Sequence, residues 1–224
     1  MLKANLERVF EDIKNGNNLG ERITLVGATK TVSPEVINQA VEYGLKFVAE
    51  NKVNEFREKH GKIVGATEHF IGHLQTNKVK YLVGQVELIH SVDSFHLAQE
   101  ISNQAVKKDV VQDVLVQVNV GKEPQKGGFM PEEAVEQAHA ISALPNLRVK
   151  GLMAMLPLTD DQNLLKNLCL QMRELFDRLN NEGYNLSYLS VGMSADYKIA
   201  IQNGSNMIRL GSTIFGKRNY GEIR

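Results

Sequence analysis

The chain has no tryptophan and only one cysteine, Cys169, among its 224 residues. One cysteine cannot form an intrachain disulfide, which fits a reducing compartment, and we expect a cytoplasmic protein. No segment approaches the roughly 18 apolar residues of a membrane span. The charged N-terminus also lacks an apolar stretch of signal-peptide length. The composition therefore predicts a soluble protein that does not associate with membranes.

An excess of charge of either sign is missing as well. Lysines and arginines together number 26, as do aspartates and glutamates, so the formal net charge is zero. A general nucleic-acid-binding protein is usually basic, so we expect no nucleic-acid partner. The balanced charge and the lack of a visible apolar patch favour a monomer.

Several common functional motifs do not occur. The first turn, ATKTVSP, holds no GxGxxG, which disfavours an open doubly wound sheet that binds a dinucleotide. Neither a P-loop nor a GxSxG elbow is present. His69 and His73 are four residues apart, but no Cys, Asp or Glu cluster completes a metal-ligand set. The sequence therefore predicts no metal site.

What the sequence does contain is a regular alternation of strand and helix patterns. An amphipathic N-terminal helix is followed by eight units of about 25 residues, each a short apolar segment and a helical pattern. Eight parallel strands close naturally into a barrel. We therefore predict an α/β fold, a single (β/α)8 TIM barrel with an extra N-terminal helix, as one domain over 1–224. The expected strands lie within 23–29, 46–51, 68–73, 86–92, 110–120, 147–155, 186–192 and 206–216.

Proline marks the start of two expected helices. Ser33 and Pro34 fit the N-cap and first position of a helix, and Pro131 fits the start of another helix over 131–144. Cys169 lies in the middle of a long helical pattern beside apolar residues. A buried structural thiol is therefore the expected role of this cysteine.

The stretch 192–218 carries the clearest chemistry. Two apolar segments there each break into small, hydroxyl-bearing residues: Ser194 follows the first, and Gly211, Ser212 and Thr213 follow the second. Backbone N–H groups, hydroxyls and a helix N-terminus suit a phosphate dianion. A (β/α)8 barrel places such a site in the loops after its last two strands.

Lys30 follows the first expected strand directly. Partial desolvation at the inner rim of a barrel favours the neutral, nucleophilic amine, and catalytic groups of barrels lie at the carboxyl ends of strands. The plain alternative is a solvated loop lysine. A phosphate site combined with a lysine at a strand end suggests pyridoxal 5′-phosphate (PLP) held as a Schiff base.

Other candidate residues also lie at or near strand ends. Arg209 lies within an apolar strand, where an outward side chain could snorkel and an inward one would need a partner such as phosphate or a pyridine nitrogen. Asn51 ends the second strand, and His73 lies in a polar segment beyond the third. Met153 and Met155 end the sixth; they are most simply core residues, although one could cover a cofactor ring.

Seven segments together resemble the pyridoxal phosphate homeostasis protein family, a one-domain relative of the alanine racemase barrel. They are VGATK ending at Lys30, AEN at 49–51, HFIGHLQTNK at 69–78, QVNVGKEPQKGG at 117–128, GLMAM at 151–155, GMSADYKIAI at 192–201 and IRLGSTIFGKR at 208–218. The resemblance runs from about residue 3 to residue 218. Ala49, Lys52, Glu68 and Gly127 depart from the usual pattern of the family, and these departures affect the rim loops and not the cofactor site.

The resemblance implies a role for each candidate. Lys30 matches the lysine that binds PLP covalently, and Arg209 matches the arginine that faces the pyridine nitrogen. The phosphate site matches Ser194, Gly211 and Ser212. The positions that line the cofactor pocket match Asn51, His73 and Met153.

The implied function is PLP binding in vitamin B6 homeostasis and amino-acid or keto-acid balance, with little or no catalytic turnover. PLP-dependent apoenzymes, amino acids and keto acids are the candidate partners. An arginine cannot give up its proton, so it keeps the ring nitrogen unprotonated and weakens PLP as an electron sink.

Two enzymatic alternatives remain open. The first is a PLP-dependent amino-acid racemase, whose relatives add a C-terminal β domain carrying a tyrosine base. Here the sequence ends eight residues after IFG and offers no obvious acid or base opposite Lys30. We therefore expect no racemase activity. The second alternative is a barrel enzyme that acts on a phosphorylated sugar, with Lys30 binding the substrate directly.

Overall fold

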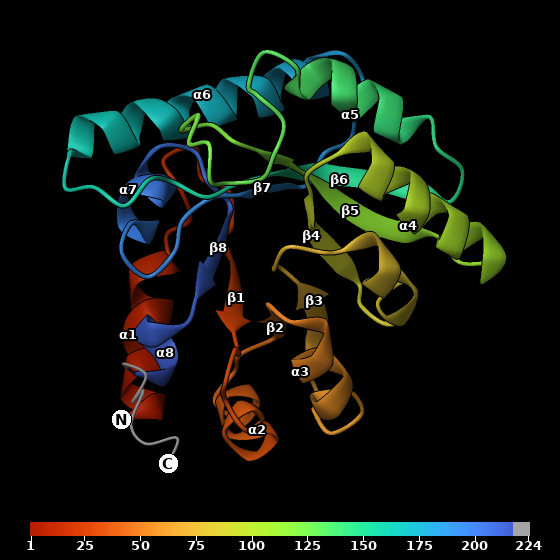
Figure 1. The fold of residues 1–224 in the computed structure, drawn as a ribbon. Helices are drawn as coiled ribbons and strands as arrows, with labels where there is room; N and C mark the ends of the chain where they lie inside the picture. The colour runs from red at the N-terminus through yellow and green to blue at the C-terminus, as the bar shows by residue number, and fades with distance from the viewer. Residues whose placement is uncertain (217–224) are drawn as a thin grey trace.

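Eight parallel strands close into a barrel in chain order, with β1 paired to β8 (Figure 1). The computed structural model describes residues 1–216, so Lys217 and Arg218 of the last motif lie outside the described residues. The closed sheet confirms the (β/α)8 prediction. The strands are β1 Thr24–Ala28, β2 Phe47–Glu50, β3 Thr67–Phe70, β4 Leu88–Val92, β5 Gln112–Val118, β6 Leu147–Ala154, β7 Tyr188–Ser190 and β8 Met207–Leu210.

Helical segments connect successive strands and cover the outside of the barrel (Figure 1). The link between β3 and β4 is a 3₁₀ helix, η1 Thr76–Tyr81. The α-helices are α1 Leu2–Ile13, α2 Pro34–Glu42, α3 Val53–Lys59, α4 Phe95–Lys107, α5 Ala134–Ser142, α6 Gln162–Asn181, α7 Tyr197–Gln202 and α8 Ser212–Phe215.

The first residues of two helices test the predictions that were made from proline positions. Helix α2 begins at Pro34 with Ser33 as its N-cap, as predicted. Helix α5 begins at Ala134, so the prediction of a start at Pro131 was wrong. Residues 131–133 form a turn instead, in which the Glu133 N–H donates to the Met130 carbonyl at 3.0 Å. A proline can open a turn as readily as a helix.

Helix α1 packs against the outside of the barrel beside α8. Leu6 and Val9 of α1 are fully buried, which confirms the amphipathic pattern. The Asn5 side chain donates to the Ile214 carbonyl of α8 at 2.9 Å and joins the two helices. Figure 1 shows α1 in red and α8 in blue side by side.

Apolar side chains fill both the space beneath the helices and the interior of the barrel. The interior, here called the lumen, contains the buried residues Val26, Ala49, Leu88, Leu115, Met153 and Met207. Cys169 of α6 is buried between helix and sheet, and burial raises the pKa of its thiol to about 12. This cysteine is therefore a structural thiol, as predicted. Among residues 1–216, no helix is both long enough and apolar enough to span a membrane.

Candidate functional site

A cavity of about 480 Å³ opens at the carboxyl ends of the strands. This rim cavity has apolar walls and a few polar groups that converge from several strand ends, as is typical of small-molecule sites. Its lining residues are Ala28, Asn51, Ile71, Met155, Met193, Ser194, Ala195, Arg209, Gly211 and Ser212.

Lys30 borders a second hollow, of about 340 Å³, that shares a wall with the rim cavity. The shared wall consists of Ala28, Gly211 and Ser212. Lys30 is half-buried, and among the described residues its amine has no hydrogen-bond or ion-pair partner. The amine is therefore free to react or to bind a ligand.

Hydrogen bonds hold the backbone firmly on both sides of Lys30. The preceding Thr29 donates from its hydroxyl to Glu50 at 2.6 Å and from its backbone to the Ala49 carbonyl at 2.9 Å. The following Thr31 has a φ of 63°. This left-handed conformation is rare for a β-branched residue and marks local strain. The Glu55 carboxylate stabilises it by accepting from the Thr31 N–H at 2.8 Å.

A buried ion pair completes this support. Lys59 donates to the Glu50 carboxylate at 2.7 Å and to the Thr29 carbonyl at 2.9 Å. Both charged side chains are buried, and within residues 1–216 the second carboxylate oxygen of Glu50 has no partner. Lys59 thus joins the residue after β1 to the last residue of β2 and holds the two strand ends together. Removing either charged partner would leave the other charge buried and unpaired. We call Glu50, Glu55 and Lys59 the β1–β2 clamp.

A tight turn after β7 presents Ser194 to the rim cavity. Gly192 has a φ of 107°, and a Cβ there would lie 2.9 Å from the Ala200 Cβ, so the turn requires glycine. Asp196 accepts from the Met193 N–H at 2.5 Å and fixes the turn. Burial raises the pKa of this Asp196 carboxyl, whereas the hydrogen bond from Met193 lowers it.

The turns after β7 and β8 face each other. The Ser194 hydroxyl accepts from the Thr213 N–H at 3.3 Å, which links the β7 turn to the start of α8. Gly211 and Ser212 lie at that same helix start. The hydroxyls of Ser194 and Ser212 and the backbone at the start of α8 therefore lie together on the wall of the rim cavity.

Arg209 points into the barrel and lines the floor of the rim cavity. Its guanidinium donates to the Ser190 carbonyl at 2.7 Å, the Ser190 hydroxyl at 2.6 Å and the Ala154 carbonyl at 2.9 Å. Among the described residues it makes no ion pair with a carboxylate. Burial lowers the pKa of Arg209 to about 10, so the group remains charged near neutral pH.

Asn51 reaches the rim cavity because β2 and β3 end close together. A Cβ on Gly72 would lie 1.9 Å from the Asn51 carbonyl, so the close approach of these two segments requires glycine at that position. The Ile71 N–H also donates to the Glu50 carbonyl at 3.0 Å. Asn51 and Ile71 thereby become neighbours on one wall of the cavity.

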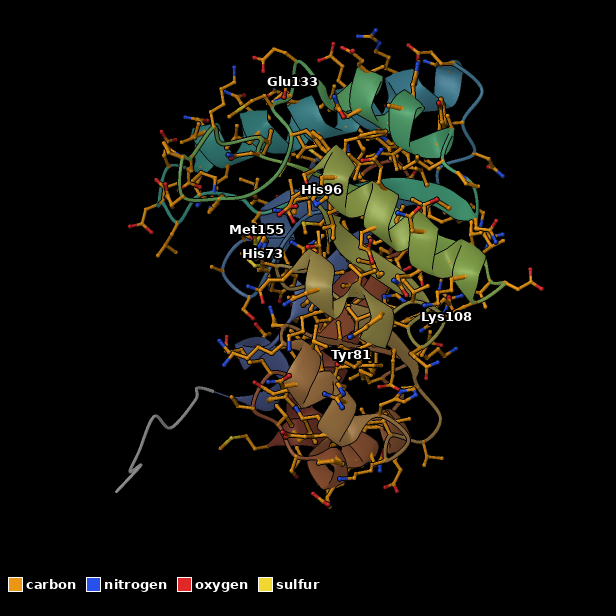
Figure 2. The ribbon with its side chains drawn as sticks, turned by 45° about the vertical axis from the view of Figure 1, so that its right-hand side comes forward. His73, Tyr81, His96, Lys108, Glu133 and Met155 are labelled. Atoms are coloured by element: carbon orange, nitrogen blue, oxygen red, sulfur yellow. The ribbon has the colours of Figure 1, made fainter. Side chains whose placement is uncertain are left out.

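Two of the predicted pocket residues do not line the rim cavity. Met153 is buried in the lumen, and Met155 lies on the cavity wall instead. His73 is exposed on the outer rim, where its ring lies 3.1 Å from the Asp93 carboxylate. Figure 2 shows His73 and Met155 at the same edge of the molecule in that view. Met153 lies within β6, whereas Met155 follows the last residue of that strand and so lies farther toward the rim.

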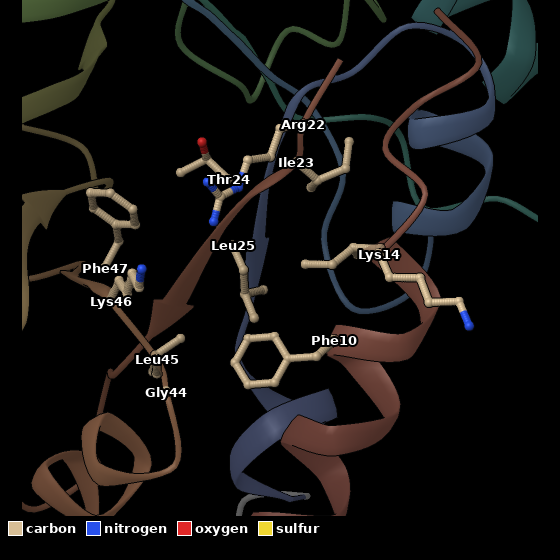
Figure 3. Close-up of a pocket in the computed structure, with 11 residues that line it drawn as sticks. Phe10, Lys14, Arg22, Ile23, Thr24, Leu25, Gly44, Leu45, Lys46 and Phe47 are labelled. Atoms are coloured by element: carbon tan, nitrogen blue, oxygen red, sulfur yellow. The ribbon is translucent and has the colours of Figure 1, made fainter. Parts of the chain in front are cut away.

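A larger cavity, of about 510 Å³, lies far from these groups. It is bounded by α1 and by the residues that begin β1 and β2. Figure 3 shows the ring of Phe10 pointing toward Leu25 and Leu45 across this space. No predicted site residue lies on its walls, and active sites of barrels lie at the opposite end of the strands. Size alone therefore does not identify the functional site.

The part of the chain from 1 to 216 contains no group of three or more His, Cys, Asp and Glu side chains placed to bind a metal ion. The cations at this edge of the barrel are instead Arg209 in the rim cavity and Lys30 in the adjoining hollow, and amides and hydroxyls accompany them. Such a set suits an anionic ligand.

Comparison with known proteins gives consistent matches over nearly the whole chain. The family model for the alanine racemase N-terminal domain matches residues 25–219. A pyridoxal phosphate homeostasis protein from Aquifex aeolicus is 44% identical over 96% of this chain and 94% of its own length. The protein of that name from Escherichia coli K12 is 34% identical over 90% of this chain and 88% of its own.

A solved structure gives the same result. PipY from Synechococcus elongatus, determined with PLP bound, matches 96% of this chain and 100% of its own, with 26% identity and a TM-score of 0.85. The family model, the sequence identities and the fold all agree. The chain thus belongs to the alanine racemase N-terminal domain family and, within it, to the pyridoxal phosphate homeostasis proteins.

Proposed function

We propose that this protein binds PLP in the rim cavity, with Lys30 forming a Schiff base to it, and serves vitamin B6 homeostasis with little or no turnover. One observation carries the proposal. A buried, charged Arg209 lies on the floor of a cavity that has a serine- and glycine-rich turn on one wall, and Lys30 lines the hollow behind that wall. A ring nitrogen, a phosphate and an aldehyde fit these three features in turn.

The residues present fit each part of the cofactor. Ser194, Ser212 and the N–H groups at the start of α8 would hold the phosphate, since charge-assisted hydrogen bonds of this kind contribute about 1.5–3 kcal/mol each. The apolar side chains of Met155 and Ile71 would cover the faces of the ring. PLP supplies an aldehyde and an electron-withdrawing ring when bound.

The chain's own residues explain why turnover would be low. Arg209 remains protonated and donates hydrogen bonds, so it cannot hand a proton to the ring nitrogen. Among residues 1–216, the walls of the rim cavity include no tyrosine, histidine or carboxylate that could move a proton on the face opposite Lys30. Two-sided proton transfer requires such a second group. Binding and release of the cofactor are therefore the proposed activity.

The proposal extends to the setting of this activity. The rim cavity is open to solvent, so amino acids, keto acids or PLP-dependent apoenzymes could reach the cofactor. We place the protein in the cytoplasm because its one thiol is unpaired and buried.

Borohydride trapping tests the site directly. The purified protein is loaded with PLP, reduced with borohydride, digested and mapped by mass spectrometry. We expect the modified peptide to contain Lys30. The Lys30→Ala variant should lose the trapped adduct but still bind PLP non-covalently through Arg209 and the phosphate site.

Lys52 provides the matched control, because it is an exposed lysine beside the rim residue Asn51. Lys52→Ala should retain the full adduct. A trapped adduct on another lysine in the Lys30→Ala variant would show that the Schiff base is assigned to the wrong residue.

A further inference from the structure

Four polar side chains form a hydrogen-bonded chain through the otherwise apolar lumen. Arg209 on β8 donates to the Ser190 hydroxyl on β7 at 2.6 Å. That hydroxyl lies 3.3 Å from Nδ1 of His90 on β4, and Nε2 of His90 lies 3.1 Å from Nδ1 of His69 on β3. At most 4% of any of the four residues is exposed. We call His69, His90 and Ser190 the lumen chain.

Counting protons gives the lumen chain a direction. Arg209 can only donate, so the Ser190 oxygen accepts from it and the Ser190 hydroxyl is free to donate to Nδ1 of His90. His90 then carries its proton on Nε2 and donates to Nδ1 of His69. His69 then carries its proton on Nε2. Among the described residues, this is the one nitrogen of the lumen chain that is buried without a hydrogen-bond partner.

The reverse direction satisfies fewer groups. His69 would donate to His90, and His90 would donate to the Ser190 oxygen, which already accepts from Arg209. The Ser190 proton would then be directed at no acceptor, and the lone pair on Nε2 of His69 would also be unsatisfied. Because unsatisfied buried polar groups are costly, the direction that leads away from Arg209 is favoured.

Both imidazoles are neutral. Burial lowers the pKa of His69 to about 3 and lowers that of His90 well below its usual value, with smaller contributions to the His90 shift from His69 and Arg209. The lumen chain thus consists of oriented dipoles whose negative ends point toward the guanidinium. Arg209 makes no ion pair with a carboxylate among the described residues, although the charge of Asp196 raises its pKa, and these dipoles face its guanidinium.

Filling the lumen does not explain these residues. Leu88, Leu115 and Met153 occupy the same interior and need no hydrogen bonds. Two histidines and a serine have to be desolvated and keep one N–H unsatisfied, which apolar residues of similar size would avoid. What they add is a negative potential at the guanidinium.

We propose that His90 and His69, acting through Ser190, are positioning residues that stabilise the charged Arg209 and thereby weaken its hydrogen bond to the pyridine nitrogen of the cofactor. This inference rests on the proposed function, because it requires the ring nitrogen to face Arg209. Without the lumen chain the guanidinium would be a stronger donor, and the ring nitrogen would be more strongly polarised.

Nitrogen-15 NMR of the holoprotein, loaded with PLP labelled at the ring nitrogen, measures this property. Ser190→Ala removes one oxygen from the lumen chain, and His90→Leu removes an imidazole with little change in volume. We expect the ring-nitrogen resonance to move upfield, toward the protonated form, in both variants. Leu88→Met, on the same strand and in the same lumen but outside the chain, should keep the wild-type resonance.

The outcomes separate the inference from the proposed function. If wild-type protein fails to bind the label, the proposed function fails, and the inference fails with it. If the label binds and Ser190→Ala has the wild-type resonance, the inference alone is overturned. An equal shift in Leu88→Met would overturn it as well, since general repacking would then suffice. If His90→Leu does not fold, Ser190→Ala decides the question.

Discussion

Acid should destabilise the apoprotein well before its carboxylates titrate, because two neutral histidines are buried in the lumen. Unfolding exposes His69 and His90 to water, where an imidazole has a pKa of about 6.5. In the folded protein, burial lowers the pKa of both groups. Between the two values the unfolded chain binds more protons, so the free energy of unfolding falls as the pH falls.

The magnitude follows from proton linkage. The stabilisation is fully present above pH 6.5 and is lost progressively as the pH falls toward the folded pKa, which for His69 is about 3. Between pH 7 and pH 5, His69 should account for a loss of about 2 kcal/mol, and His90 adds a loss of the same sign because burial lowers its pKa as well. The loss from His69 alone is a substantial share of the roughly 5–15 kcal/mol that stabilises a typical domain.

Urea denaturation of the apoprotein at pH 7 and pH 5 measures this loss. His69→Gln and His90→Gln replace each imidazole by a polar group that does not titrate in this range. His69→Gln should reduce the loss on acidification by about 2 kcal/mol, and His90→Gln should also reduce it, whatever the stability of either variant at pH 7. His96→Gln, on the exposed surface of α4 (Figure 2), is the control and should show the wild-type loss. A pH dependence unchanged in both lumen variants would refute the reasoning.

Other predictions concern the clamp, the phosphate site and the ring partner. Lys59→Met leaves Glu50 buried without its partner, so it should destabilise the protein by about 3–5 kcal/mol in urea denaturation. A decrease of less than 1 kcal/mol in the free energy of unfolding would show that the Glu50–Lys59 pair does not hold the clamp together. The double variant Ser194→Ala, Ser212→Ala should keep Lys30 reactive but weaken PLP retention in dialysis by roughly 100-fold or more; unchanged retention would place the phosphate elsewhere. Arg209→Glu should protonate the ring nitrogen, shift the absorbance of bound PLP and expose side reactions on amino acids, and an unaltered spectrum would argue that Arg209 does not face the ring. Wild-type protein loaded with PLP should not racemise alanine or other common amino acids above background, and robust turnover would refute the proposed function.

The barrel could be predicted from sequence because its signals are local. Each strand is a short apolar run and each helix repeats apolar residues on one face, so neither requires knowledge of distant contacts. The start of α5 was misjudged because Pro131 is compatible with both a turn and a helix. Arg209 was correctly recognised as a candidate for the interior, but its sequence neighbours could not decide whether it points inward.

The site was harder to predict, because depth along the barrel axis depends on the stagger between strands. Met153 and Met155 are two residues apart in the sequence, yet only Met155 lines the rim cavity. The lumen chain gave no sequence signal, since His90 and Ser190 are 100 residues apart. The β1–β2 clamp likewise depends on where α3 places Lys59 relative to β1.

The thin wall between the two hollows at the rim has a consequence for access. Ala28 and Gly211, two of the smallest residues, form most of it. Gly211 has a φ of −109°, which any residue can adopt, and a Cβ there would lie 3.4 Å from the Ala28 carbonyl. An alanine at this position is therefore compatible with the backbone, whereas a longer side chain would have to extend into the space between the amine and the guanidinium. The space between the Lys30 amine and the Arg209 guanidinium can therefore be filled one carbon at a time from position 211 without altering any charge.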